Sequence, residues 1–203
     1  MRLQLPLVAG AALFIGACSI GKPIPTPTTY SIEPALAMAD ARGPAHPERL
    51  RVGRVQVAAP YDRPALVYRL TTVRYASDPY HAFLAEPGPM LGNRIAAWLD
   101  QAGLFKAVAG PGSTPPASLV LEATVTELYG DFQQNAKPAA VMAIRITIVD
   151  QASARPQVTY ERTISRRIPL ANATPEDLVR GYDTALADIL SQLASDLSAP
   201  MAH

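Results

Sequence analysis

The alternation of side chains between residues 142 and 148 limits the fold of this chain more than any other feature. From Met142 to Ile148 every second position carries a large apolar side chain, and the positions between are small or polar. A two-residue period is typical of a strand with one buried face. Comparable runs occupy residues 119–125 and 158–168. Because no helical segment separates the three runs, we predict consecutive strands joined by hairpins in a mixed or antiparallel sheet.

Two other segments have the spacing of amphipathic helices. The first begins near Pro87–Pro89 and ends at Gly103, a residue type that commonly terminates helices. The second begins after Thr174, which can cap it, and its apolar stripe ends at Leu197. Two amphipathic helices that cover one face of the sheet make a two-layer α+β domain, which is the fold class that we predict.

The region before the first helix has a weaker pattern. Residues 28–32 and 50–57 predict short strands, and Gly53 interrupts the second of them. Two runs rich in β-forming residues, 65–70 and 71–75, follow without a turn residue between them. The boundary between these two strands therefore stays open.

The first 18 residues have the features of an exported bacterial lipoprotein. Arg2 supplies a positive charge, and the apolar stretch from Leu3 to Ile15 is too short to span a membrane. The sequence Ile15-Gly16-Ala17-Cys18 resembles the bacterial lipobox, in which the cysteine thiol receives a diacylglyceryl group. We predict that residues 1–17 are a lipoprotein signal peptide and that Cys18 is the lipidated mature N-terminus, anchored by its acyl chains.

The residues after Cys18 predict where the folded domain sits. Residues 18–27 are rich in proline and form either an extended tether or a disordered leader before the domain at residues 28–198. Ser19 occupies the position at which Asp usually retains such lipoproteins in the inner membrane. A serine rather than an aspartate at this position favours the outer membrane, with the domain on the periplasmic face.

Charge and cysteine content exclude several classes of function. The chain has 18 Lys and Arg against 17 Asp and Glu, a net charge of +1, so its bulk charge does not attract nucleic acid. A lone cysteine cannot form an intrachain disulfide, and no Cys/His cluster has the spacing of a metal site. We therefore expect no nucleic-acid partner, no metal and no cofactor.

Candidate catalytic residues are few. His81 lies near Asp78 and could act as a base with an orienting acid, and Ser165 stands on a predicted strand. The spacing matches no known catalytic pattern, and an exposed polar position explains each residue more simply. No nucleophile elbow, zinc-binding helix motif or phosphate-binding loop occurs. The sequence therefore predicts no catalytic residues, and a hydrolase that uses His81 or Ser165 is the lowest-ranked hypothesis.

The segment from Ala59 to Arg69 stands out from the rest of the chain. Its sequence is Ala-Pro-Tyr-Asp-Arg-Pro-Ala-Leu-Val-Tyr-Arg. Asp62 before Arg63-Pro64 favours a tight turn, and the final Tyr-Arg pair suits a binding surface. Taken alone, a turn between two strands explains the segment better than a site does.

The order of these motifs resembles a known family over about residues 18–198. A lipobox is followed by Thr-Tyr-Ser-Ile, by the Asp-Arg-Pro…Val-Tyr-Arg segment, by Ala85-Glu86-Pro87 at a helix start, and by hairpin strands and a final helix. The chain resembles the ABC-type transport auxiliary lipoproteins, the PqiC-like family that is partnered with MCE (mammalian cell entry) lipid-transport systems. Two details depart from the pattern: Tyr61 directly precedes Asp62, and His81-Ala82-Phe83-Leu84 replaces the usual tryptophan region before Ala85.

The resemblance implies a non-enzymatic adaptor on the periplasmic face of the outer membrane. Its partner would be an MCE-domain protein of a transport system that moves phospholipid or a similar hydrophobic molecule, with ATP hydrolysis in a separate component. The candidate partner-binding residues are Tyr61, Asp62, Arg63, Tyr68 and Arg69. Whether they contact the partner, contact a second copy in a homo-oligomer or only shape the fold stays open. The alternative hypothesis is a periplasmic lipid-binding carrier with an apolar pocket between sheet and helices.

Overall fold

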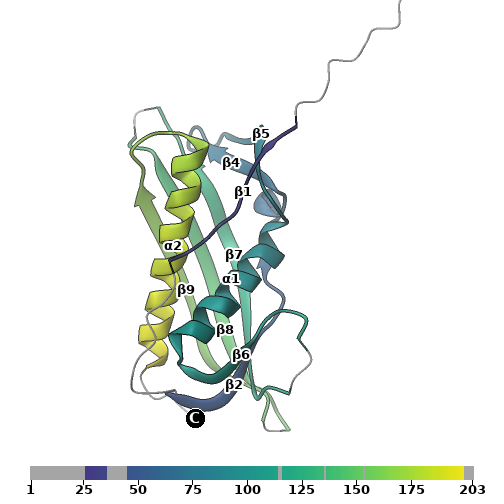
Figure 1. Cartoon of the computed structure of the whole chain (residues 1–203). Helices are drawn as coiled ribbons and strands as arrows, with labels where there is room; N and C mark the ends of the chain where they lie inside the picture. The colour runs from purple at the N-terminus through teal and green to yellow at the C-terminus, as the bar shows by residue number, and fades with distance from the viewer. Residues whose placement is uncertain (1–25, 36–44, 114–115, 135, 153, 199–203) are drawn as a thin grey trace, which may run out of the picture.

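The domain consists of a mixed sheet and two helices that cover one of its faces (Figure 1). This arrangement confirms the predicted α+β fold. The computed structural model describes residues 26–35, 45–113, 116–134, 136–152 and 154–198. The elements are β1 (Thr28–Tyr30), β2 (His46–Val52), β3 (Gln56–Val57), the 3₁₀ turn η1 (Ala59–Tyr61), β4 (Ala65–Arg69), β5 (Tyr75–Phe83), α1 (Pro87–Ala102), β6 (Phe105–Ala109), β7 (Leu119–Asp131), β8 (Ala139–Asp150), β9 (Gln157–Pro169) and α2 (Pro175–Leu197).

Strand β7 is the centre of the sheet. One of its edges pairs antiparallel with β8 from end to end, and β8 pairs antiparallel with β9, as the alternating pattern predicts. Its other edge takes three short parallel strands in succession: β2 at residues 119–121, β3 at residues 124–125 and β4 at residues 130–131. Strand β6 extends the sheet beyond β2, and β5 and β1 extend it beyond β4.

The weaker sequence patterns are partly confirmed. The interruption near Gly53 separates β2 from β3, and the Gly53 amide donates a 2.8 Å hydrogen bond to the Leu121 carbonyl. The strand predicted at residues 71–75 is wrong. Residues 70–74 form a turn closed by the Leu70 amide and the Arg74 carbonyl (2.8 Å), and the strand begins only at Tyr75.

The end of α1 and the start of α2 lie where their capping residues predict. Helix α1 stops at Gly103, whose φ of 67° is in the left-handed region that glycine adopts without strain. At the start of α2 the Thr174 hydroxyl accepts a 3.2 Å hydrogen bond from the Asp177 amide. None of the helices in the described residues is long and apolar enough to cross a membrane.

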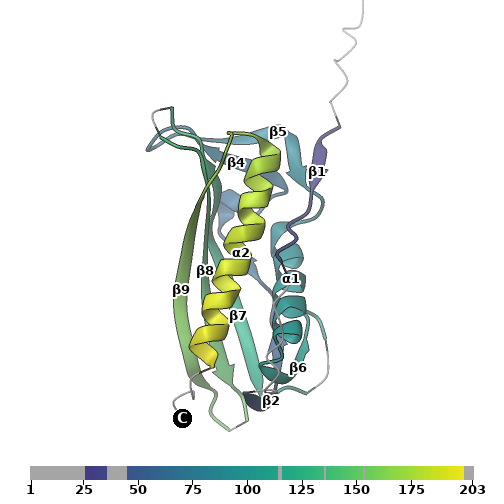
Figure 2. The same ribbon diagram turned by 60° about the vertical axis from the view of Figure 1, so that its left-hand side comes forward.

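The core lies between the helices and the sheet. Helix α2 packs over β8 and β9, and α1 lies beside it over β2 and β6 (Figure 2). Side chains such as Ile144, Ile146, Leu186 and Ile189 are 0% exposed, so this interface is filled. Neither α1 nor α2 covers the other side of the sheet, which we call the open face. It carries the alternate residues of β7 and β8, among them Glu122 and Arg145.

Candidate functional site

A buried ion pair holds the end of the Ala59–Arg69 segment. Arg69 donates from Nε to Asp131 Oδ1 (3.1 Å) and from Nη2 to Oδ2 (2.6 Å). Asp131 is 1% exposed and also accepts hydrogen bonds from Arg167 and Gln133. The hydrogen bonds from Arg69, reinforced by those from Arg167 and Gln133, outweigh burial and lower the pKa of Asp131 to about 2. The carboxylate is therefore charged at neutral pH and fixes the end of β4 against β7.

An aromatic cluster surrounds this ion pair on the open face. The Arg69 guanidinium carbon lies 5.0 Å from the centroid of the Tyr129 ring. Tyr61 stacks on Tyr129 with ring centroids 6.0 Å apart, and Tyr75 meets it edge-on at 5.6 Å. Burial raises the pKa of Tyr61 to about 12. Tyr61 and Arg69, two of the five candidate partner-binding residues, thus meet at Tyr129.

Tyr68 lies on the opposite side of β4, away from Tyr61 and Arg69. Its ring stacks on Phe132 with centroids 5.0 Å apart, and its hydroxyl donates to Asp78 Oδ2 at 2.7 Å. His81 Nδ1 lies 2.8 Å from the same carboxylate oxygen. Burial raises the pKa of Asp78, but hydrogen bonds from Tyr68, from the Tyr80 amide and from His81 outweigh it, so the pKa lies below its ordinary value.

Asp62 and Arg63 are the exposed members of the five. They follow η1 and precede β4. Asp62 borders a cavity of about 620 Å³ between β3 and the start of α1, together with Glu86 and Gly88. The structure therefore separates the predicted set into a half-buried support, made of Tyr61, Tyr68 and Arg69, and an exposed pair.

The predicted catalytic candidates do not form one site. His81 does contact Asp78, which supplies a base and its orienting acid. Ser165, however, is on β9 opposite Ala143, whereas His81 is on β5, where it pairs with Thr28 of β1. No hydrogen bond joins Ser165 to His81 among the described residues, and these residues contain no group of three or more side chains arranged to hold a metal ion.

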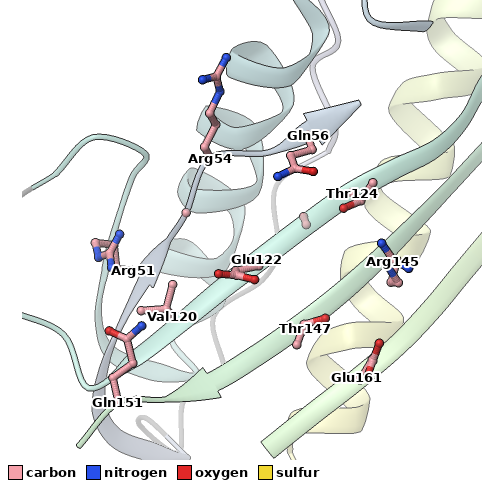
Figure 3. Close-up of a pocket in the computed structure, with 12 residues that line it drawn as sticks. Arg51, Arg54, Gln56, Val120, Glu122, Thr124, Arg145, Thr147, Gln151 and Glu161 are labelled. Atoms are coloured by element: carbon pink, nitrogen blue, oxygen red, sulfur yellow. The ribbon is translucent and has the colours of Figure 1, made fainter. Parts of the chain in front are cut away.

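A charged groove lies at the other end of the open face, and sequence reasoning missed it (Figure 3). It has a volume of about 550 Å³ and is lined by β2, β3 and the three long strands. Figure 3 shows Glu122 on β7 between Arg51 on β2 and Arg145 on β8. The polar members of the alternating strands were the available signal. These residues line a groove only because β2 and β3 lie beside β7, and the two-residue period does not reveal that arrangement.

Comparisons with known proteins identify relatives of the whole domain. The sequence profile described as "ABC-type transport auxiliary lipoprotein component" matches residues 30–194. The structure of protein XCC0632 from Xanthomonas campestris is 18% identical, with a TM-score of 0.72 over 82% of this chain and 92% of its own. A second structure, described as an uncharacterized protein, is 16% identical, with a TM-score of 0.64 over 85% and 99%. At these identities the structures show a shared fold. The search of curated proteins returned no match.

Proposed function

Because the chain belongs to the family of ABC-type transport auxiliary lipoprotein components, we propose that it is the lipid-anchored adaptor of an MCE-type transport system. The role of the family is auxiliary to transport rather than catalytic. In this proposal the acyl chains of Cys18, which lies outside the described residues, hold the domain on the periplasmic face of the outer membrane. An MCE-domain protein binds the domain, so that phospholipid or a similar hydrophobic molecule moves between the two membranes.

One observation carries the choice of the binding surface. The exposed residues Asp62 and Arg63 stand between two segments that are fixed from inside, η1 through Tyr61 on Tyr129 and β4 through Arg69 on Asp131. An interface held rigid before binding loses less conformational freedom when the partner arrives. We assign partner contact to Asp62 and Arg63, and support of that surface to Tyr61, Tyr68 and Arg69.

The packing of the core supports an adaptor over a lipid carrier. A carrier needs an apolar space between sheet and helices, where this domain has side chains such as Met142, Ile144, Leu190 and Leu193, all 0% exposed. Cavities around Asp62 and Glu122 lie at the surface and are lined largely by polar groups. These features favour contact with another protein rather than enclosure of an acyl chain.

Direct binding tests the proposal. The affinity of the purified lipoprotein in detergent for the MCE-domain protein of the same organism is measured by isothermal titration calorimetry. Saturable binding is expected, with an affinity at least tenfold lower in the Asp62→Ala/Arg63→Ala variant. Both side chains are exposed, so the fold is unaffected.

The matched control is Arg180→Ala/Asp188→Ala on α2, in the helical layer. Absence of binding by the wild-type protein refutes the adaptor, and equal losses in both variants refute the assigned surface.

Membrane fractionation tests the anchor separately. The wild-type protein is expected in the outer-membrane fraction of a sucrose gradient and Cys18→Ser in the soluble periplasmic fraction, since the variant has no thiol to acylate. Wild-type protein in the inner-membrane fraction would contradict the location but leave the lipid anchor intact.

A further inference from the structure

Exposed apolar side chains gather on one hairpin. Five large hydrophobic residues are exposed in the described chain: Val73 (88%), Leu84 (71%), Val158 (59%), Tyr80 (55%) and Tyr75 (44%). Three of them, Val73, Tyr75 and Tyr80, belong to the turn between β4 and β5 or to β5 itself. Val73 is at the tip of this hairpin, where no described residue covers it. Aromatic and aliphatic side chains with this exposure are typical of membrane interfaces as well as of protein contacts.

Two cations stand beside this hairpin. Arg74 follows Val73, and Lys137 belongs to the turn between β7 and β8. The two turns are neighbours, because one surface hollow of about 460 Å³ is lined by residues of both: Leu70, Thr71, Thr72 and Arg74 from one, and Gln133, Gln134 and Ala136 from the other. Both side chains are exposed, and neither forms an ion pair with a carboxylate in the part of the chain that the structure describes.

The N-terminal segment enters the domain at this same end. Strand β1 pairs in parallel with β5, with Thr28 opposite His81, one residue from Tyr80. The Tyr30 hydroxyl donates a 2.7 Å hydrogen bond to Glu176 at the start of α2, which fixes β1 to the domain. In both ribbon views β1, the β4–β5 hairpin and the first turn of α2 lie together at the top of the molecule (Figures 1 and 2).

Chain length places this end nearest the anchor. Thr28 follows Cys18 by ten positions, and a chain of that length spans at most about 35 Å when fully extended. Strand β7, with 13 residues, carries the opposite end of the domain about 40 Å farther away. Of the two ends of the sheet, the end with the hairpin is therefore the one that the acyl chains hold close to the bilayer.

We propose that this end, defined by Val73, Arg74, Tyr80 and Lys137 and here called the docking end, binds the surface of the membrane that holds Cys18. Val73 and Tyr80 enter the interfacial region, and Arg74 and Lys137 contact anionic lipid headgroups. The inference rests on the proposed lipid anchor. It gives the domain one orientation on the membrane, with the charged groove directed away from the bilayer.

Tryptophan fluorescence tests the orientation. Full-length lipoproteins carrying Val73→Trp or Val158→Trp are reconstituted into vesicles of equal parts phosphatidylglycerol and phosphatidylcholine. Val158 is the matched control, an exposed valine at the start of β9, at the far end of the sheet. The native Trp98 is 4% exposed, with Nε1 bonded to the Ala35 carbonyl, and gives a constant background that is subtracted.

The two tryptophans are expected to behave differently. Brominated lipid should quench Trp emission in Val73→Trp at least threefold more than in Val158→Trp, and aqueous iodide should do the reverse. Equal iodide quenching in both variants, with no effect of brominated lipid, overturns the docking end. A partner protein or a second copy of this chain would then be the occupant of that surface.

A charge variant tests the headgroup contact. Arg74→Gln/Lys137→Gln is introduced into the Val73→Trp protein, and the ratio of docked to undocked domain should fall by about 25-fold, since each cation contributes about fivefold to this ratio near an anionic surface. The fall should be absent with pure phosphatidylcholine. An unchanged fraction in both lipids overturns the headgroup contact. Flotation of the wild-type protein with the vesicles reports the anchor itself, so loss of docking with intact flotation leaves the proposed function standing.

Discussion

Arg69 and Asp131 are register partners across the parallel junction of β4 and β7, and their side chains also form an ion pair with each other. The Arg69 Nη2 lies 2.6 Å from Asp131 Oδ2, and the carboxylate is 1% exposed. The junction is short, since β4 meets β7 at only two residue pairs. The ion pair therefore adds a side-chain attachment to the short backbone pairing of β4 with β7.

Removal of the Arg69 side-chain charge should destabilise the domain strongly. Arg69→Met leaves the buried Asp131 carboxylate with Arg167 and Gln133 as partners, and breaking one side of a buried ion pair typically costs about 3 kcal/mol. The free energy of unfolding is measured by urea denaturation monitored by circular dichroism. Arg167→Met is the control, because the Arg167 side chain is 47% exposed and its loss should cost less. Equal costs in the two variants would contradict the role assigned to Arg69.

Acid should weaken the same junction over a defined range of pH. The pKa of Asp131 is lowered to about 2 in the folded protein, whereas an unfolded aspartate titrates near 3.9. The charged carboxylate therefore stabilises the fold fully above about pH 4, and the contribution, about 2 kcal/mol, is lost as the pH falls toward 2. Urea unfolding of the wild-type protein and Asp131→Asn at several pH values checks this. The stability gap between them should narrow from pH 6 to pH 2.5, and a constant gap would contradict the assignment.

Helix α2 approaches β8 too closely for a side chain at Gly181. A Cβ atom there would lie 2.6 Å from the Ala140 Cβ and 2.7 Å from the Leu170 Cδ2. Gly181→Ala should lower the free energy of unfolding by about 2 kcal/mol through overpacking, in spite of the higher helix propensity of alanine. Thermal unfolding measures the effect. Gly110→Ala is the matched control, since its nearest neighbour, the Ala96 Cβ, is 3.8 Å away. A Gly181→Ala protein as stable as wild type would show that α2 can shift outward freely.

The cap of α2 should contribute measurably to stability. Thr174→Ala removes the hydroxyl that accepts from the Asp177 amide, and the loss of such a cap costs about 1 kcal/mol. Thr184→Ala, at an exposed position inside the same helix, should be neutral or slightly stabilising, because alanine is the better helix former. Urea denaturation compares the two variants, and the prediction fails if they lose stability equally.

The sequence predicted those elements that local patterns encode. The long strands β7, β8 and β9 follow from two-residue alternation, and the ends of α1 and α2 follow from Gly103 and Thr174. These signals are local because a strand face or a helix cap is determined by residues within a few positions of one another. The mixed character of the sheet was predicted only as one of two options.

The parts that were missed depend on contacts between distant residues. Strand β6 was not predicted, because its five residues become a strand through parallel pairing with β2. Asp131 was not singled out, since nothing near it in sequence reveals that Arg69 lies opposite. His46, which the sequence places in a proline-rich segment, is buried against Phe105 with Nε2 2.7 Å from the Leu197 carbonyl.

The candidate site was likewise predicted from local sequence only in part. The Ala59–Arg69 segment was recognised from its sequence, yet the alternation of β4 sends Tyr68 to one side and Arg69 to the other. Five residues of one 11-residue segment were therefore predicted as one surface, whereas only Asp62 and Arg63 among them are exposed. A strand contributes to both of its faces, so proximity in sequence does not imply a common surface.

The central place of β7 also constrains the order in which the sheet assembles. Residues 46–69 are synthesised before residues 119–131, and the pairing of Leu50 with Leu119 bridges 69 positions of sequence. The edges of β2, β3 and β4 that pair with β7 therefore stay unpaired until residues 119–131 are available, and unpaired strand edges are prone to pairing with other chains. Because the native partner of these edges is β7, a strand of 13 residues, assembly of the sheet depends on residues that follow them by more than 60 positions.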